Sequence, residues 1–453
     1  MGPNTQKLIE RHKQVLATTT HSPNFPVSIE SGKGIWVWDA DGNIYIDCFS
    51  QVGIADIGHN HPKVINALIN YLSSGKVTAC IGTDVYNTAQ VEAAEKLTEI
   101  TKKSFPQKDW KVYFCSSGGE TNNAVYKLLA DIRPQRRLFL SFLGDFHGRF
   151  GAALAFSSSK ALHKRDFSRD PPTIHFPYPD CLHCAYEKNP ADCDQICIRI
   201  IEKEYLGRLC DPKEINGVII EPIQGEGGFI VPNFTAIKKL HELCLKYDWA
   251  LVDDEVQAGL GRTGKMFAIE YSEVMPAIIC LAKKLGSGIP IGAIVFRADW
   301  DFTEAGRHST TFGGGPLGWV SAKKTLEVIE EENLVANAAE TGAYFLAKLI
   351  GIQSRFNSAR RFKYDHIGCI SDVRGLGLMI GIEFADEKGG PSPSLRDAVL
   401  RECIKSGILP FAAGHPQRNP IIRFLPPIIA TKSDIDEISN RFEKALNMAC
   451  EKK

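Results

Sequence analysis

A pair of lysines directly follows an apolar run in the middle of the chain. The run at residues 277–281 ends in Ala282, Lys283 and Lys284. A lysine at the end of a buried strand is withdrawn from water, which lowers the pKa of its amine and makes that amine nucleophilic. The position alone is equally compatible with two surface charges, so the chemistry must be judged together with the neighbouring motifs.

Acidic residues follow two other apolar runs. The run at 249–252 is followed by three acids at 253–255, and the run at 217–220 is followed by Glu221 and Glu226 in a glycine-rich turn. Burying acidic side chains at the end of a strand costs free energy unless a ligand pairs with them. A carboxylate that pairs with a protonated ring nitrogen would explain one of the three.

Two glycine-containing turns could hold a phosphate. The run at 111–115 leads through Gly118 and Gly119 into a helical pattern, and residues 308–316 offer hydroxyls and glycines before another helical pattern. Glycines let a ligand approach the backbone, and the amides at a helix N-terminus favour an anion. A plain strand-to-helix turn would explain the first of these equally well.

An aromatic residue and an arginine follow the apolar run at 137–142. Phe146 could stack on a planar ligand, and Arg149 could bind a carboxylate. Ligands of open α/β sheets bind at the carboxyl ends of the strands, where all these motifs lie. A lysine, an acid, a phosphate turn and an aromatic ring at successive strand ends are what a pyridoxal phosphate site requires.

The elements that must position these residues form an α/β pattern. Several of the expected strands are apolar throughout, and helical stretches such as 235–246 lie between many of them. This alternation favours a large domain with a mostly parallel sheet. The expected strands are at 111–115, 137–142, 217–220, 249–252, 277–281 and 291–296.

The rest of the chain predicts a second, smaller α+β domain. A hairpin is expected around Asp41-Gly42, and one long helical stretch from Pro316 to about Leu349. Later strands are expected near 373–375, 379–384 and 421–425. We therefore predict an N-terminal segment at 1–63 that joins the small domain, a large cofactor-binding domain at 64–330 and a small domain at 331–453.

Composition excludes several classes of partner. Lys+Arg and Asp+Glu both number 53, so the net charge is zero and no nucleic-acid partner is expected. No apolar run reaches the roughly 18 residues needed to cross a bilayer, so no membrane partner is expected. The polar N-terminus and the 13 scattered cysteines favour a cytoplasmic, reducing location.

The order of these motifs resembles that of the class III aminotransferases, which are fold-type I pyridoxal phosphate enzymes. The likeness covers nearly the whole chain, and the joint pattern of 221–228, 254–264 and 282–292 is specific to that family. It implies pyridoxal 5'-phosphate as the cofactor, Lys283 as the Schiff-base lysine and Asp254 as the acid that binds the pyridine nitrogen. These two residues are our candidate catalytic residues.

The resemblance also assigns the remaining cofactor contacts. Thr311 resembles a threonine that reaches the phosphate from the other subunit, which implies a homodimer or a higher homo-oligomer with shared active sites. Gln257 matches a residue near the 3'-oxygen of the cofactor ring. Phe146 matches the aromatic residue that stacks on that ring. The full expected set is Gly118, Gly119, Phe146, His147, Glu221, Asp254, Gln257, Lys283 and Thr311.

Within the family the chain most resembles 4-aminobutyrate aminotransferases. Arg149 and Arg423 match residues that hold substrate carboxylates, and Ile54 matches an apolar wall of the pocket. Glu226 resembles a glutamate that pairs with an arginine and releases it, so that one pocket serves two substrates. The implied partners are an ω-amino acid or a related amino acid and 2-oxoglutarate or another 2-oxo acid, while ornithine, lysine and α-amino donors remain open.

The chain departs from the family pattern at several positions. Gly119 stands where a serine or alanine is usual, and Lys284 stands where a small residue is usual. Thr83 stands where a glutamine is expected, and Gly315 stands where an asparagine is common. The segment 180–209 is longer than the usual connection. These changes leave the cofactor chemistry intact and bear on the substrate.

Three other functions compete with transamination. A racemase or epimerase of the same family would use the same lysine, but racemising members tend to carry Asp where this chain has Glu226. A nicotinamide-dependent oxidoreductase is suggested only by the G-x-G-x-x-G spelling at 259–264, which lies too far from its strand. A non-catalytic partner-binding relative would not need Lys283 and Asp254.

Four cysteines cluster in the segment 180–209. Two close pairs resemble a zinc site, although the gap between the pairs is short. Some 4-aminobutyrate aminotransferases carry an iron–sulfur cluster through a short cysteine pair, and free thiols or disulfides are further alternatives. We assign no metal ligand here and leave the state of Cys181, Cys184, Cys193 and Cys197 open.

Overall fold

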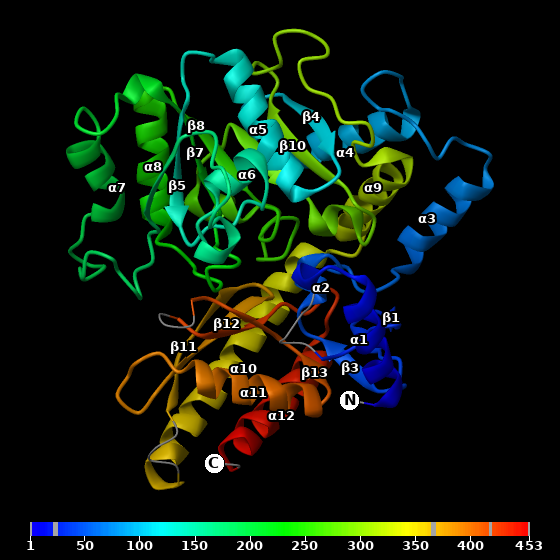
Figure 1. Cartoon of the computed structure of the whole chain (residues 1–453), viewed down its shortest axis with the longest axis vertical. Helices are drawn as coiled ribbons and strands as arrows, with labels where there is room; N and C mark the ends of the chain where they lie inside the picture. The colour runs from blue at the N-terminus through cyan, green and yellow to red at the C-terminus, as the bar shows by residue number, and fades with distance from the viewer. Residues whose placement is uncertain (1, 21–25, 364–367, 416–418, 452–453) are drawn as a thin grey trace.

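The computed structural model describes residues 2–20, 26–363, 368–415 and 419–451. A large α/β part lies at the top of Figure 1, and a smaller part with two four-stranded sheets lies below it. The large sheet has seven strands in the order β4-β10-β9-β8-β7-β5-β6. Its strands are β4 Trp110–Cys115, β5 Leu138–Leu143, β6 Thr173–Pro177, β7 Ile215–Ile220, β8 Ala250–Asp254, β9 Ile278–Leu281 and β10 Gly292–Arg297.

Most neighbours in the large sheet are parallel, as the apolar runs predicted. Strands β6, β5, β7, β8 and β9 pair in parallel, and β10 pairs antiparallel with both β9 and β4. Every residue of β7, β8 and β9 is buried, which explains why their sequences show no polar alternation. The strand β6, which contains a histidine and ends in a proline, was not among the predicted strands.

Helices cover both faces of this sheet. Residues of α5 (Gly118–Ile132) and α6 (Gly151–Phe156) share one buried apolar cluster with the sheet. Residues of α4 (Thr88–Ser104), α8 (Phe234–Tyr247) and α9 (Gly315–Glu331) share the other. The arrangement is therefore a three-layer α/β fold, in which the strands carry their carboxyl-terminal residues to one edge.

The smaller part contains the N-terminal hairpin and the C-terminal segment. Strand β3 (Ile44–Asp47) pairs antiparallel with β2 (Trp36–Trp38), as predicted around Asp41-Gly42, and in parallel with β13 (Ile408–Leu409). The N-terminal segment and the C-terminal segment thus share one sheet. The other strands are β1 Ser31–Lys33, β11 Cys369–Leu376, β12 Met379–Ala385, β14 Phe411–Ala413 and β15 Ile421–Phe424.

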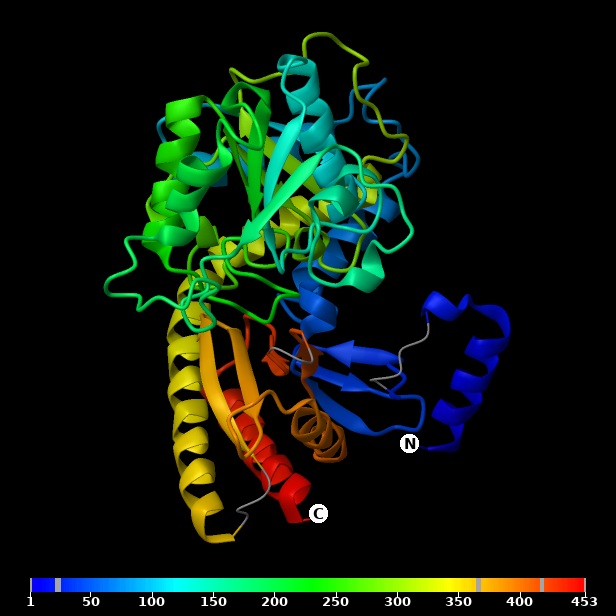
Figure 2. The ribbon, with the colours of Figure 1, turned by 60° about the vertical axis from the view of Figure 1, so that its left-hand side comes forward.

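The long helical stretch expected from Pro316 to about Leu349 is two helices, so that prediction was wrong. Helix α9 ends at Glu331, and α10 (Leu334–Lys363) begins after Asn333, whose φ of 51° is left-handed. Asparagine tolerates this conformation, which breaks the helix while the apolar pattern continues. Figure 2 shows α10 running along the whole length of the small part. The remaining helices are α1 Pro3–Val15, α2 Ser50–Gly53, α3 Pro62–Ser73, α7 Ile196–Ile200, α11 Pro393–Lys405 and α12 Lys432–Glu451.

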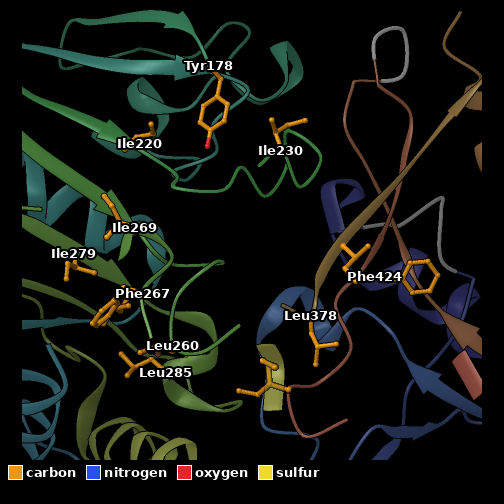
Figure 3. Close-up of a cluster of buried hydrophobic side chains, with 14 of the residues drawn as sticks. Tyr178, Ile220, Ile230, Leu260, Phe267, Ile269, Ile279, Leu285, Leu378 and Phe424 are labelled. Carbon is orange, nitrogen blue, oxygen red and sulfur yellow. The ribbon is translucent and has the colours of Figure 1, made fainter. Parts of the chain in front are cut away.

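One buried apolar cluster continues from the large part into the small part. In Figure 3, Leu260, Phe267 and Leu285 lie on the side of the large sheet, and Leu378 and Phe424 lie on the side of the small part. Shared burial of this kind makes the two parts pack as one body. Among the described residues, no helix is both long and apolar enough to cross a membrane.

Candidate active site

A cavity of about 590 Å³ lies at the carboxyl ends of the large sheet's strands. It is lined by residues that follow β4, β5, β7, β8 and β9 in the sequence, which is where sequence reasoning placed the site. The predicted site residues in its wall are Ile54, Gly118, Gly119, Phe146, His147, Arg149, Glu221, Glu226, Asp254, Gln257 and Lys283.

Asp254, the last residue of β8, presents a tightly held carboxylate to the cavity. Its Oδ1 accepts a bond from the amide of Val256 at 3.1 Å. Its Oδ2 accepts one from Nδ2 of Asn122 at 2.9 Å and lies 2.7 Å from Nδ1 of His147. These contacts fix the orientation of a buried acid, as a carboxylate that must meet a ring nitrogen requires.

His147 lies behind Asp254 as a buried cation. Its Nε2 lies 3.5 Å from Oδ2 of Asp145, so an acid faces each ring nitrogen. Burial by itself lowers the pKa of His147, but the bonds to Asp145 and Asp254 outweigh it and raise the pKa to about 10. The imidazolium therefore supports the negative charge of Asp254 at neutral pH.

Lys283 begins a short 3₁₀ turn immediately after β9. Its φ is 46°, a left-handed value that few non-glycine residues adopt and that often marks a functional position. Within the described part of the chain its Nζ makes no hydrogen bond, and burial lowers the pKa of its amine. The amine is thus available to act as a nucleophile.

The N-terminus of α5 forms a turn suited to a phosphate. Ser117 caps the helix, with its Oγ accepting a bond from the amide of Glu120 at 3.3 Å. Gly118 and Gly119 are the first two helical residues, whose amides have no acceptor inside a helix. A Cβ on Gly119 would lie 2.7 Å from the ring of Phe150, so glycine at this departure from the family pattern makes room for that ring.

Glu221 and Gln257 shape the wall between Phe146 and Asp254. Glu221 accepts bonds from the amide of Phe146 at 2.7 Å and from that of Gly225 at 2.9 Å. Burial, followed by the nearby charge of Asp145, raises the pKa of Glu221 to about 8. A Cβ on Gly225 would lie 1.8 Å from Oε1 of Gln257, so this glycine is needed for the glutamine to fit.

Two cations bind the carboxylate of Glu226, one on each oxygen. Nη2 of Arg423 donates to Oε1 of Glu226 at 2.9 Å, and Nζ of Lys160 donates to Oε2 at 3.2 Å. Burial raises the pKa of Glu226, but the charges of Arg423 and Lys160 outweigh it and lower the pKa to about 2. Arg423, on β15, is almost fully buried between the rings of Phe229 and Phe411 and lies just behind the cavity wall.

Arg149 and Phe146 face the same end of the cavity. The guanidinium carbon of Arg149 lies 5.8 Å from the centre of the Phe146 ring, close enough for a cation–π contact. Lys160 and the apolar Ile54 also line the wall. The cavity therefore combines a planar aromatic side with a cationic end.

Two predicted site residues are absent from the cavity wall: Arg423 lies just behind it, and Thr311 lies elsewhere. It is exposed, and it belongs to the segment before α9, which does not line the cavity of its own chain. A role at the phosphate would require this segment to reach the site of a second copy. The expected contact of Thr311 stays a prediction.

The four clustered cysteines do not converge on a ligand. Cys181, Cys184, Cys193 and Cys197 are partly buried, and none of them forms a disulfide. In the described ranges of the chain, no group of three or more histidines, cysteines or acids is arranged to hold a metal ion.

Sequence reasoning missed several residues of the site. Asn122 lies one helical turn after Gly118 and could have been found from that spacing, since residues four apart share a helix face. Val52, Lys160 and Phe411 line the cavity from irregular segments or the small part, where no periodic signal marks them.

The arrangement fits pyridoxal phosphate. One cavity is lined by the amine of Lys283, which has no hydrogen bond among the described residues, by the oriented carboxylate of Asp254 and by the free helix amides of Gly118 and Gly119. Phe146 supplies an aromatic surface in the same wall. These are the groups that would bind the aldehyde, the ring nitrogen, the phosphate and the ring face.

Comparisons with known proteins identify a family and a cofactor. A family model described as aminotransferase class-III matches residues 17–446. The chain is 34% identical over 440 residues to an acetylornithine aminotransferase of Methanothermobacter thermautotrophicus, covering 96% of both chains. It is 32% identical over 450 residues to an alanine/serine racemase of Pyrococcus horikoshii, covering 98% of this chain and 91% of that one.

A solved structure extends the likeness to three dimensions. The ornithine aminotransferase of Toxoplasma gondii, which has pyridoxal phosphate partially occupying its active site, superposes with a TM-score of 0.78. The identity is 28%, and the match covers 99% of this chain and 95% of that one.

Proposed function

The chain belongs to the class-III aminotransferases, and on that premise we propose that it moves an amino group from an ω-amino acid such as 4-aminobutyrate, or a related amino acid, to 2-oxoglutarate or another 2-oxo acid. Its cofactor is pyridoxal 5'-phosphate, on which this family depends. The named relatives include acetylornithine and ornithine aminotransferases, so a 4-aminobutyrate-like donor is a proposal of our own.

The observation that carries the proposal is the pairing of Glu226 with Arg423 at a cationic end of the cavity. Arg149 and Lys160 add two further cations that can bind a terminal carboxylate. With Glu226 in place, the charge of Arg423 is neutralised, and a donor without a carboxylate at that point fits. When Glu226 moves aside, Arg423 can bind the carboxylate next to the oxo group of an acceptor.

The electrostatics of Arg423 support this exchange. Its Nη1 donates to the carbonyl of Gly225 at 3.0 Å and its Nη2 to Glu226, while its buried Nε has no partner among the described residues. A buried N–H group without an acceptor costs free energy. The Nε of Arg423 could therefore donate a hydrogen bond to a further carboxylate oxygen.

The protein's own groups have distinct tasks in the proposed reaction. Pyridoxal phosphate, when bound, supplies an aldehyde that binds amines and a ring that accepts the electron pair of a bond broken at the substrate carbon. Asp254 would bond to the ring nitrogen of the bound cofactor, and His147 fixes the orientation of the Asp254 carboxyl group. Lys283 would hold the cofactor through its amine, and the same amine, when free, would move the proton at the substrate carbon.

Burial assists Lys283 in this role. Because burial lowers the pKa of the amine, a larger fraction is neutral and able to accept a proton near neutral pH. The apolar residues Val52 and Ile54 line the wall of the same cavity.

The amino donor is tested by comparing 4-aminobutyrate, ornithine, N-acetylornithine and L-alanine. Each donor is mixed with 2-oxoglutarate, and the formation of glutamate is measured. The proposal expects the highest kcat/KM with a donor that carries its amine far from a carboxylate. A preference for L-alanine over all ω-amino donors would refute the donor assignment while leaving transamination in place.

A second candidate is an amino-acid racemase. It is supported by the 32% identity to the alanine/serine racemase over 98% of the chain. Such an enzyme would return a proton to the opposite face of the same carbon and consume no oxo acid. The resemblance of Glu226 to the glutamate that pairs with and releases an arginine favours transamination.

Shared active sites are a further part of the proposal. Thr311 is exposed on its own chain and lies in a segment that can extend to a second copy. We therefore propose a homodimer or higher homo-oligomer in which Thr311 completes the phosphate site of the partner.

A further inference from the structure

Lys284 is a fully buried cation directly after the cofactor lysine, at a position where the family resemblance leads one to expect a small residue. Only 1% of its surface is exposed. Its Nζ donates to the carbonyls of Gln257 and Gly259, both at 2.7 Å, and lies 3.1 Å from Oδ2 of Asp56. A lysine is rarely buried unless its charge is paired and bonded, so this arrangement has a specific structural purpose.

The partner of Lys284 ends a strained segment of the cavity wall. Ser50, Gln51 and Val52 have successive φ values of 47°, 52° and 63°. Left-handed backbone is unfavourable for such residues, above all for the β-branched Val52, and it persists only where the surroundings enforce it. Val52 and Ile54 of this segment line the cavity, and Asp56 follows them.

The strained segment is held at both ends. At its start, the amide of Ser50 donates to Oδ1 of Asp47 at 2.8 Å, and Oγ of Ser50 donates to the carbonyl of Leu425 at 2.6 Å. At its end, the buried carboxylate of Asp56 pairs with Arg262 and with Lys284. Of these anchors, Lys284 alone is next to Lys283 in the chain.

Lys284 therefore connects three parts of the site. It is bonded to the backbone at Gln257, it neighbours Lys283, and through Asp56 it holds the wall that carries Val52 and Ile54. Arg262 continues the network to the small part, because its Nη1 donates to the carbonyl of Leu378 at 2.9 Å.

We propose that Lys284 is a positioning residue that keeps the strained turn at 50–52 in place, so that Val52 and Ile54 form the amino-substrate wall opposite Lys283. Its loss should loosen the wall and weaken substrate binding without removing any group that reacts. The substrate part of this inference rests on the proposed function, whereas the ordering of residues 48–58 does not.

The test compares Lys284→Met and Lys284→Gln with the cofactor-loaded wild-type protein. Asp56 keeps Arg262 as its counter-ion in both variants, so the fold should survive. Gln keeps a donor for the carbonyls of Gln257 and Gly259 without the charge. Lys265→Met is the matched control, because Lys265 is exposed in the loop that also carries Gln257 and Gly259, and among the described residues its amine contacts only the ring of Tyr271.

Two readouts are measured, of which one needs no substrate. In Lys284→Met, hydrogen–deuterium exchange of the amides at 48–58 should rise about tenfold, as expected for loss of a buried charged hydrogen bond, with little change elsewhere. The KM for the best amino donor should rise by a similar factor, with kcat nearly unchanged. Lys284→Gln should fall between wild type and Lys284→Met, and Lys265→Met should match wild type.

The opposite results are equally clear. Unchanged exchange at 48–58 with an unchanged KM in Lys284→Met would overturn the proposal, as would exchange that rises equally over the whole chain. If Lys284→Met does not fold, the same two criteria apply to Lys284→Gln. If no amino donor is turned over at all, the proposed function fails, and the exchange measurement still decides the role of Lys284.

Discussion

Arg423 and Glu226 form a partly buried ion pair of 2.9 Å between β15 of the small part and the loop after β7, although 197 residues separate them. Lys160 binds the other oxygen of the same carboxylate at 3.2 Å. The pair places a neutralised cation beside the cavity. We propose that a substrate without a carboxylate binds while the pair is intact, and that a substrate with a carboxylate binds Arg423 when Glu226 moves aside.

Replacing Glu226 with Gln should slow the half-reaction with the amino donor more than the half-reaction with the 2-oxo acid. Arg423 would keep its charge without its counter-ion, which disfavours an ω-amino donor that offers no carboxylate there. We expect kcat/KM for such a donor to fall about tenfold to a hundredfold, with the 2-oxoglutarate half-reaction retained. Stopped-flow rates of the two half-reactions check this, and equal losses in both would contradict a switching role.

Replacing Arg149 with Met should weaken donors that carry a terminal carboxylate. The loss of a charge-assisted hydrogen bond predicts a fall in kcat/KM for 4-aminobutyrate of about tenfold to a hundredfold. A donor amine without a carboxylate should change little. Arg165→Met is the control, because Arg165 is 72% exposed and pairs with Asp166 at the surface. An equal effect on both kinds of donor would argue against a carboxylate site at Arg149.

Replacing Lys283 with Ala should abolish turnover while leaving the cofactor site formed. The loss of the positioned proton-transfer group alone predicts a fall of at least about 10²-fold. Asp254 and the turn at Gly118 remain, so the variant should still bind pyridoxal phosphate without a covalent bond. Mass spectrometry after borohydride reduction checks this: the cofactor should be fixed to Lys283 in wild type and to no residue in the variant.

His147 should give the cofactor-free protein a characteristic dependence on pH. Its folded pKa of about 10 lies above the ordinary value of 6.5. A raised pKa means that the native state binds the proton more tightly, so this stabilisation is complete below pH 6.5 and is lost as the pH rises towards 10. Urea unfolding between these pH values should show a steeper loss of the free energy of unfolding in wild type than in His147→Gln. Parallel curves for the two proteins would show that His147 is neutral in the fold.

The sequence predicted much of the site because its residues follow apolar strands. Asp254 ends the buried strand β8, and Glu221, Lys283 and Gly118 follow their strands within a few residues. Parallel strands must bring their carboxyl ends to one edge, so proximity followed from chain order alone.

Other features depend on contacts that no local pattern encodes. Lys160 reaches Glu226 from an irregular segment, and Arg423 comes from another sheet. The break between α9 and α10 interrupts a continuous apolar pattern at Asn333, and β6 has no apolar run long enough to stand out. These positions are set by tertiary packing.

The central claim, that this chain transfers amino groups, is tested most directly by following glutamate and enantiomer composition together. Purified protein is mixed with L-amino acids, D-amino acids and 4-aminobutyrate, each with and without 2-oxoglutarate. We predict that glutamate forms only when donor and 2-oxoglutarate are both present, and that no amino acid is inverted. Inversion of an amino acid without consumption of an oxo acid would contradict this account and identify a racemase.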